Sequence, residues 1–206
     1  ADSGGKLGVA SFTMAMLDRG TRTRSALEIA AEEERLGANM SAGSNLDASS
    51  IRLSALKTEF QPSMNLWADI LLNSVFDQDE IDRLRGQWIA GIAQEKAEPA
   101  GLALRLLPPA IYGSNHAYGV PFTGSGTEAS IESLTREDLV SFKNTWLRPD
   151  NATIFVAGDT TLIEIMPMLE QALAGWNVPQ TPEPTKNISD VSLPSEPRMI
   201  LIDIPN

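Results

Sequence analysis

The chain is poor in histidine and cysteine, two of the residue types that most often bind metals or serve as catalytic bases and nucleophiles. The 206 residues include one histidine, His116, and no cysteine. Ser11 lies in an apolar segment, but no histidine stands near it in the sequence to act as the base that a serine nucleophile needs. Catalytic zinc usually requires three protein ligands, so a lone histidine cannot build such a site. We therefore expect His116 to be a packing residue with one satisfied hydrogen bond.

The segment from Gly8 to Thr21 nevertheless has the frame of a metal-binding helix. It resembles the zinc helix of the pitrilysin/insulinase metallopeptidases (the inverzincins), whose active members read roughly G-x-A-H-F-x-E-H-M-L-x-x-G-T. In that motif two histidines four residues apart share one helix face and bind Zn²⁺, and the glutamate between them activates the bound water. In this register the histidines fall on Ser11 and Ala15, and the glutamate falls on Met14.

The third zinc ligand of the family, a glutamate on a later helix, aligns with Gly91. All positions of the metal site therefore carry residues that cannot ligate zinc or move a proton. The resemblance implies that this chain contains no catalytic residue and no metal of its own.

The resemblance extends over nearly the whole chain, in order. The segment that begins at His116 reads H-A-Y-G-V-P, which is similar to the H-P-Y-G-x-P of the family. Two further segments, Thr23 to Ala30 and Leu36 to Ala38, are similar to the second helix of the family and to the residues that follow it. Three more are similar to its L-T-x-x-D-L, Y-x-R-P-D-N and V-x-G-D signatures, in this order: Leu134 to Leu139, Trp146 to Ala152, and Val156 to Asp159.

Membership of this family implies an α+β domain with a mixed, largely antiparallel sheet and helices packed on one face. Its members consist of two similar halves, on one chain or two, that close around an unfolded peptide. One half carries zinc, and this chain resembles the first domain of the other half, as in bacterial proteins similar to the mitochondrial processing peptidase. The implied partners are a zinc-bearing half and a peptide substrate. Two alternatives remain: a purely structural or assembly subunit, and an independent hydrolase with a rebuilt site.

One segment has a direct role in the active relatives. The strand that matches Asn39, Met40, Ser41 and Ala42 lies at a sheet edge there and pairs with the substrate backbone. Such pairing provides backbone hydrogen bonds without side-chain specificity. A structural edge strand without bound peptide is the alternative for this segment.

Composition excludes some functions. A net charge of −11 argues against nucleic-acid binding, because no basic patch is available to displace counterions. No run of residues approaches the ~18 apolar residues of a membrane span. A bacterial periplasmic or envelope location fits the resemblance, with the cytoplasm as the alternative. Both ends of the chain read as interrupted, and the first strand of the domain is expected to be missing.

Patterning divides the chain into a domain over residues 1–176, a Pro-rich linker over 177–197, and residues 198–206, which open a following domain or dock as a strand. We expect strands over Ala38 to Ser44, Ser49 to Leu56 and Ala152 to Ala157. We expect helices over Leu7 to Leu17, Ser25 to Leu36, Pro62 to Leu72, Asp77 to Glu95, Leu102 to Ile111 (interrupted by Pro108 and Pro109), Thr135 to Leu147, and from Gly158 to near Trp176.

Overall fold

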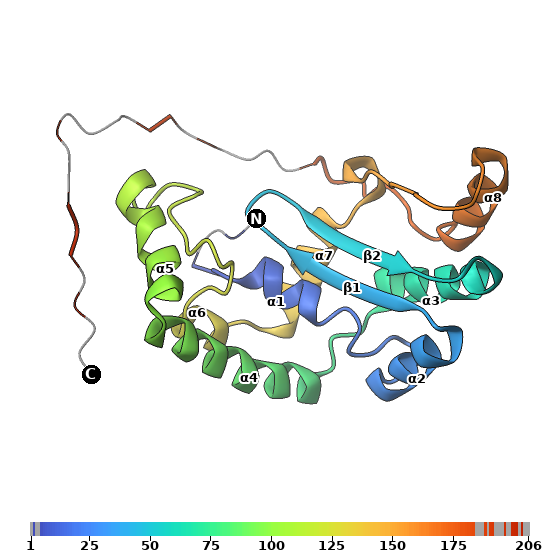
Figure 1. The fold of residues 1–206 in the computed structure, drawn as a ribbon, viewed down its shortest axis with the longest axis horizontal. Coiled ribbons are helices and arrows are strands. Elements are labelled where there is room, and N and C mark those ends of the chain that lie inside the picture. Colours follow the sequence, from blue (N-terminus) through green and yellow to red (C-terminus); the bar gives the residue numbers. More distant parts are fainter. Residues whose placement is uncertain are drawn as a thin grey trace.

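The computed structural model describes residues 2, 5–183, 188, 190, 191, 196, 199–201 and 203. Helices surround one antiparallel hairpin (Figure 1), so the predicted α+β class is confirmed. The described helices and strands are α1 (Val9–Ala15), α2 (Ala26–Leu36), β1 (Asn39–Ser44), β2 (Ser49–Ser54), α3 (Phe60–Asn73), α4 (Gln78–Ala97), α5 (Pro99–Tyr112), α6 (Glu128–Glu132), α7 (Arg136–Trp146) and α8 (Leu162–Ala172). None of these helices has the length and apolar character needed to span a bilayer.

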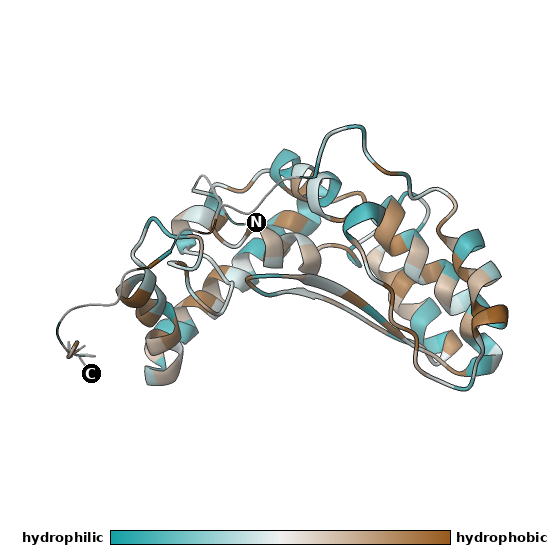
Figure 2. Ribbon diagram, turned by 90° about the horizontal axis from the view of Figure 1, so that it is seen from above, coloured by the Kyte–Doolittle hydropathy of each residue, from teal (hydrophilic) through white to brown (hydrophobic). Residues whose placement is uncertain are grey.

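The hairpin forms where alternating residues flank a turn. Asn45 Oδ1 accepts hydrogen bonds from the N–H groups of Asp47 and Ala48, which closes the turn. β1 and β2 then pair from Ser44 with Ser49 to Asn39 with Ser54. Along both strands partly buried residues alternate with exposed ones, so one face lies on the helices and the other is open. Figure 2 shows the curved hairpin edge-on, with most of the helices on one side of it.

Capping signals in the sequence locate several helix ends correctly. Ser25 and Glu28 form a capping box at the expected start of α2, and Gly37 ends that helix in the left-handed conformation. Asp77 caps α4, and Thr135 with Asp138 forms a capping box at α7. These ends are set by side chains within three residues of the bonds they make, which is why local sequence predicts them.

The hydrophobic core is built around α1. Phe12, Met14, Met16 and Leu17 in and just after this helix are fully buried. They share one cluster with apolar residues of α3, α4 and α7, for example Leu66, Ile81 and Leu139, and with the inward side chains of the hairpin. The short first helix is therefore the centre of the domain's packing.

The predicted strand Ala152 to Ala157 is wrong. These residues carry no strand assignment, and every residue from 151 to 160 is exposed. The side chain of Phe155 is 91% exposed. A strand needs a hydrogen-bonded neighbour, and no described strand lies beside this segment. The expected strand over 198–206 falls partly outside the described residues; 199–201 are described and are not in a strand.

Other predicted elements need smaller corrections. α3 begins at Phe60, before Pro62, and α5 runs from Pro99 through Pro108 and Pro109 without interruption. α8 begins at Leu162 and contains Pro167 in its interior. The five-residue helix α6 was not predicted, because it is shorter than the span in which helical periodicity becomes visible.

Two apolar side chains of α2 do not pack inward. Leu27 is 83% exposed and Ala30 is exposed, whereas Ile29 and Leu36 are buried. Seven residues separate the two buried side chains, which places them on one narrow stripe of the helix. Leu27 and Ala30 lie beside that stripe.

Candidate functional site

The loop that leads into α1 fixes the start of this helix closely. The Asp2 carboxylate accepts hydrogen bonds from Gly8 N at 2.7 Å and from Ala10 N at 3.1 Å. Burial raises the pKa of Asp2, and these two bonds oppose the rise. Gly8 adopts a φ of 87°, and a Cβ there would lie 2.9 Å from Ile131 Cδ1. Glycine is required at this position both for its backbone conformation and for close packing.

The three degenerate metal positions of α1 have different surroundings. Met14 is fully buried in the core, so its side chain does not reach a water-accessible site. Ser11 is partly exposed, and the loop that contains Gly124 packs closely on it, since a Cβ on Gly124 would lie 2.8 Å from Ser11 Oγ. Ala15 is partly buried against the core. A histidine at position 11 would therefore have to displace the loop around Gly124.

Gly91 lies on α4, one helical turn after Trp88. The Trp88 ring meets Phe12 of α1 edge to face, with 5.4 Å between ring centroids, and its Nε1–H donates to the Ser125 carbonyl at 2.9 Å. Gly91 itself is exposed, and a Cβ there would have no atom within 4 Å. Trp88 therefore joins α4 to α1, whereas the position of Gly91 has no described atom of α1 beside it.

The residues at these positions do not fit a zinc ion. A hydroxyl, a thioether, a methyl group and a glycine stand where nitrogen and carboxylate ligands are required. Among the described residues there is no group of three histidine, cysteine, aspartate or glutamate side chains that could hold a metal. No hydrolytic step can be assigned to this helix.

A buried ion pair fixes the loop next to Ser11, and sequence reasoning missed it. Arg105 of α5 is 6% exposed. Its Nη1 donates to Glu95 Oε2 of α4 and to Ser125 Oγ, each at 2.7 Å, and its Nη2 donates to the Gly126 carbonyl. Ser125 Oγ also donates to Glu95 Oε2 at 2.8 Å. The available signal was a single arginine within an apolar helical run, because a buried charge needs a partner.

The same loop is connected to the hairpin through His116 and Tyr118. His116 is buried and stacks on Tyr112 with 5.2 Å between ring centroids. Its Nδ1 accepts from Tyr118 N at 3.0 Å, which agrees with the packing role expected from the sequence. The Tyr118 hydroxyl donates to Asp47 Oδ1 at 2.7 Å in the hairpin turn, and this bond raises the pKa of Tyr118.

The outer edge of β1 is the second candidate site. Asn45 N donates to the Ala48 carbonyl at 2.9 Å, and because antiparallel pairing alternates from there, the backbone groups of Met40 and Ala42 point away from β2. No other described strand pairs with this edge. The Glu33 carboxylate of α2 accepts a hydrogen bond from Met40 N, which opposes the rise in the pKa of Glu33 that burial causes. The edge is thus partly covered at Met40, and Ala42 is the next outward position.

Comparison with known proteins agrees with this geometry. A model of the insulinase family of peptidases, family M16, matches residues 1–120, more than half of the chain. The chain belongs to this family. A model of the inactive domain of M16 peptidases matches residues 133–204. The resemblance seen in the sequence is thereby confirmed.

Individual members of the M16 family are longer than this chain. An uncharacterized zinc protease of Bacillus subtilis, YmxG, is 28% identical over 152 residues, which are 74% of this chain and 36% of that protein. The human mitochondrial-processing peptidase subunit beta is 27% identical over 159 residues, 77% of this chain and 32% of that protein. A crystal structure of an M16 inactive domain from Pseudomonas fluorescens matches 90% of this chain and 44% of its own with a TM-score of 0.81 and 28% identity. The chain spans less than half the length of each.

Proposed function

We propose that this chain is a non-catalytic domain of an M16 peptidase that pairs with a zinc-bearing half, on the same or a separate chain, and forms one wall of a peptide-holding chamber. The observation that carries this proposal is that α1 keeps its place in the core while its metal-binding positions are occupied by other residues. The helix and its packing are present, but Met14 lies in the core and Gly124 closes on Ser11. Proteolysis would therefore depend on zinc and acid–base residues of the partner half.

The hairpin supports a role in holding peptide. Its open face carries small or polar residues, among them Ser41, Gly43 and Ser50, with Arg52 as its cation. Such a face suits a water-filled chamber, since it offers no apolar patch on which an unfolded peptide would stick. An extended peptide would add to the outer edge of β1 and bond to the backbone of Ala42.

A shallow hollow lies beside the first residue of β1. It has a volume of about 540 Å³ and is lined by residues of α2 and the start of the strand, including Leu27, Ala30, Ala31 and Ala38. One side chain of a peptide paired with β1 would meet a mixed surface there, since Glu33 and Glu34 line the hollow beside the apolar residues. The exposure of Leu27, which the amphipathic pattern did not predict, is consistent with this use.

A structural or assembly subunit is the alternative function. The hydrogen bond between Glu33 and Met40 N favours it, because a charged side chain that covers an edge is one way in which proteins prevent further strand pairing. The two functions differ in whether the chain is found with a zinc peptidase.

The first test is a pull-down of the full-length protein from its source cells, read by mass spectrometry. A partner that carries an intact H-x-x-E-H motif, or such a motif elsewhere on the full chain, supports the composite peptidase. Absence of both favours the assembly subunit. Fractionation of the same cells tests the proposed periplasmic location.

The β1 edge is tested by Ala42→Pro in the assembled peptidase. Proline removes the N–H that points outward, and the ladder to β2 keeps its bonds. Loss of one backbone bond should weaken peptide binding about 10-fold, as measured by KM or by titration of an inactive complex. Gly43→Pro is the matched control, because it removes an N–H that faces β2 and should lower stability instead. Unchanged peptide binding with Ala42→Pro would remove β1 from the peptide site.

A further inference from the structure

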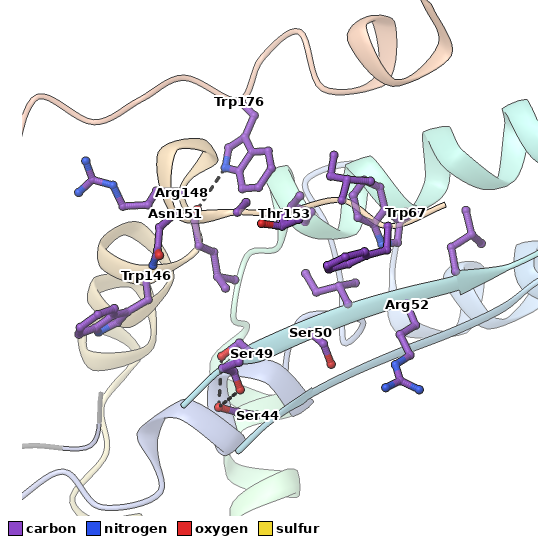
Figure 3. Close-up of a pocket in the computed structure, with 18 of the residues that line it drawn as sticks. Ser44, Ser49, Ser50, Arg52, Trp67, Trp146, Arg148, Asn151, Thr153 and Trp176 are labelled. Carbon is purple, nitrogen blue, oxygen red and sulfur yellow. Dashed lines mark hydrogen bonds between the residues drawn. The ribbon is translucent and has the colours of Figure 1, made fainter. Parts of the chain in front are cut away.

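Arg52 stands alone as a cation on the open face of the hairpin. The exposed residues of this face are Asn39, Ser41, Gly43, Ser50, Arg52 and Ser54. Figure 3 shows Ser50 and Arg52 on the side of β2 that faces away from Trp67. Among the residues that the structure describes, the guanidinium group of Arg52 has neither a hydrogen-bond acceptor nor a carboxylate partner. Its positive charge is therefore free to meet a ligand.

This isolation is unusual in the chain. Apart from Arg22 and Arg52, each described lysine and arginine side chain lies in an ion pair or donates to a backbone carbonyl group. The chain also has a net charge of −11, so carboxylates are in excess. A cation that stays unpaired although acids outnumber bases, on a wall of the proposed chamber, favours an anionic group of the ligand.

The register of the hairpin places Arg52 within reach of a peptide at the outer edge of β1. Arg52 lies directly opposite Ser41. A peptide strand added at that edge would place one of its residues opposite Ser41 in turn. Residues opposite each other in a sheet have their side chains on the same face, so this peptide side chain would share the open face with Arg52.

Only a short side chain separates the two. The Cα atoms of Arg52 and of the peptide residue would be two strand spacings apart, about 10 Å. Ser41 lies between them, and its small hydroxymethyl group leaves the space above it open. An arginine and a glutamate side chain, each extended toward the other, can therefore meet over Ser41.

The surroundings of Arg52 also fit a carboxylate. Ser50 and Ser54, two residues before and after it on β2, share its face and can donate hydroxyl hydrogen bonds. A guanidinium group binds a carboxylate through two parallel N–H bonds, which a lysine cannot do. No exposed residue of this face is apolar, so charge and hydrogen bonding are what the face offers to a peptide side chain.

We propose that Arg52 is a specificity-determining residue of the β1 peptide site and that it binds a carboxylate of the peptide residue opposite Ser41. This residue is the neighbour of the one that bonds to the backbone of Ala42. The carboxylate belongs either to a glutamate or aspartate side chain or to the C-terminus of the peptide. The inference rests on the proposed function, because Arg52 meets a peptide only if one is held at β1.

Cleavage of matched peptides by the assembled full-length peptidase tests the proposal. The peptides carry Glu at one position at a time, each with a Gln counterpart, and each is made with a free and with an amidated C-terminus. Either the Glu peptide at one position or the free C-terminus should have a kcat/KM about 5-fold higher than its neutral counterpart, which is the range of an exposed ion pair. Arg52→Gln should reduce that ratio to about 1. The ratio that changes identifies the source of the carboxylate, and a variant in which neither ratio changes would overturn the proposal.

Arg22 provides the matched control. It is the other unpaired arginine among the described residues, and it is exposed in the loop before α2. Arg22→Gln removes the same charge and should leave both ratios unchanged. An equal loss in Arg22→Gln and Arg52→Gln would indicate general attraction by the protein's charge and would refute a contact at Arg52.

Two failures can be told apart with Ala42→Pro. If Ala42→Pro leaves peptide binding unchanged, β1 does not hold the peptide, and the peptide site of the proposed function is lost together with the role of Arg52. If Ala42→Pro weakens binding and Arg52→Gln changes neither ratio, the peptide site stands and only the role of Arg52 is refuted.

Discussion

Met14→Glu is the substitution that would restore the catalytic glutamate of the family motif, and the structure predicts that it destabilises the domain. Met14 is 0% exposed, and its surroundings are apolar residues of the core. A glutamate of similar length would lose the transfer free energy of the buried thioether, about 1.5–3 kcal/mol, and would bury a carboxyl group without a partner. Together these effects should lower the free energy of unfolding by about 3–5 kcal/mol.

The loss should also depend on pH. Burial raises the pKa of a carboxyl group in the folded state, so the folded protein binds more protons than the unfolded one above pH ~4.3. The free energy of unfolding of the variant should therefore fall as pH rises, by about 1.4 kcal/mol per pH unit relative to the parent, until the folded-state pKa is passed. Below pH ~4 this added penalty disappears, and the packing loss and the cost of burying the neutral carboxyl group remain.

Urea unfolding at pH 5 and pH 7, with the parent and with Met14→Leu as references, measures both effects. Met14→Leu conserves volume and polarity and should cost less than about 1.5 kcal/mol at either pH. If Met14→Glu were as stable as the parent with the same pH dependence, the side chain at position 14 would have access to water. The buried helix that underlies the proposed function would then be wrong.

Three further predictions concern charged side chains. Glu95→Ala should lower the free energy of unfolding by about 3 kcal/mol, because it leaves Arg105 buried without its carboxylate. In urea unfolding, the double variant Glu95→Gln/Arg105→Met should recover most of this loss. A double variant as unstable as Glu95→Ala would contradict the prediction. Burial lowers the pKa of Lys143 to about 8, below its unfolded value. This group should therefore make the free energy of unfolding rise between pH 8 and pH 10, by an amount on the order of 1 kcal/mol after solvent screening. Lys143→Met should abolish that rise in unfolding curves at the two pH values. Glu33→Ala frees Met40 N at the β1 edge and should tighten peptide binding several-fold in the assembled peptidase, whereas weaker binding would show that Glu33 itself contacts the peptide.

The parts of the fold that the sequence predicted are those determined by neighbours along the chain. The capping boxes at Ser25 and Thr135 and the hairpin turn at Asn45 depend on side chains that bond within three residues. The frame of α1 was recognisable for a similar reason, since its motif is one contiguous segment. The degenerate positions Ser11, Met14, Ala15 and Gly91 and the peptide-binding edge strand follow from the family resemblance and stay predictions.

What the sequence did not predict depends on contacts between distant segments. Segment 152–157 has strand composition, but pairing requires a neighbour that local sequence cannot supply. The bond between Arg105 and Glu95, the closure of Gly124 on Ser11 and the bond between Glu33 and Met40 N each join separate elements. Whether position 14 faces the core or a cavity likewise follows from the packing of α1 and not from its motif.

The burial of Met14 gives α1 a structural role that does not depend on chemistry. Its inward side chains, Phe12 and Met14, hold together helices from most of the chain, so most replacements there would reduce the abundance of the protein. At exposed Gly91, by contrast, a Cβ would meet no atom within 4 Å, so replacement there should cost little stability. A helix that packs in this way keeps the frame of its motif when the metal-binding residues are replaced, because the frame is also what the core requires.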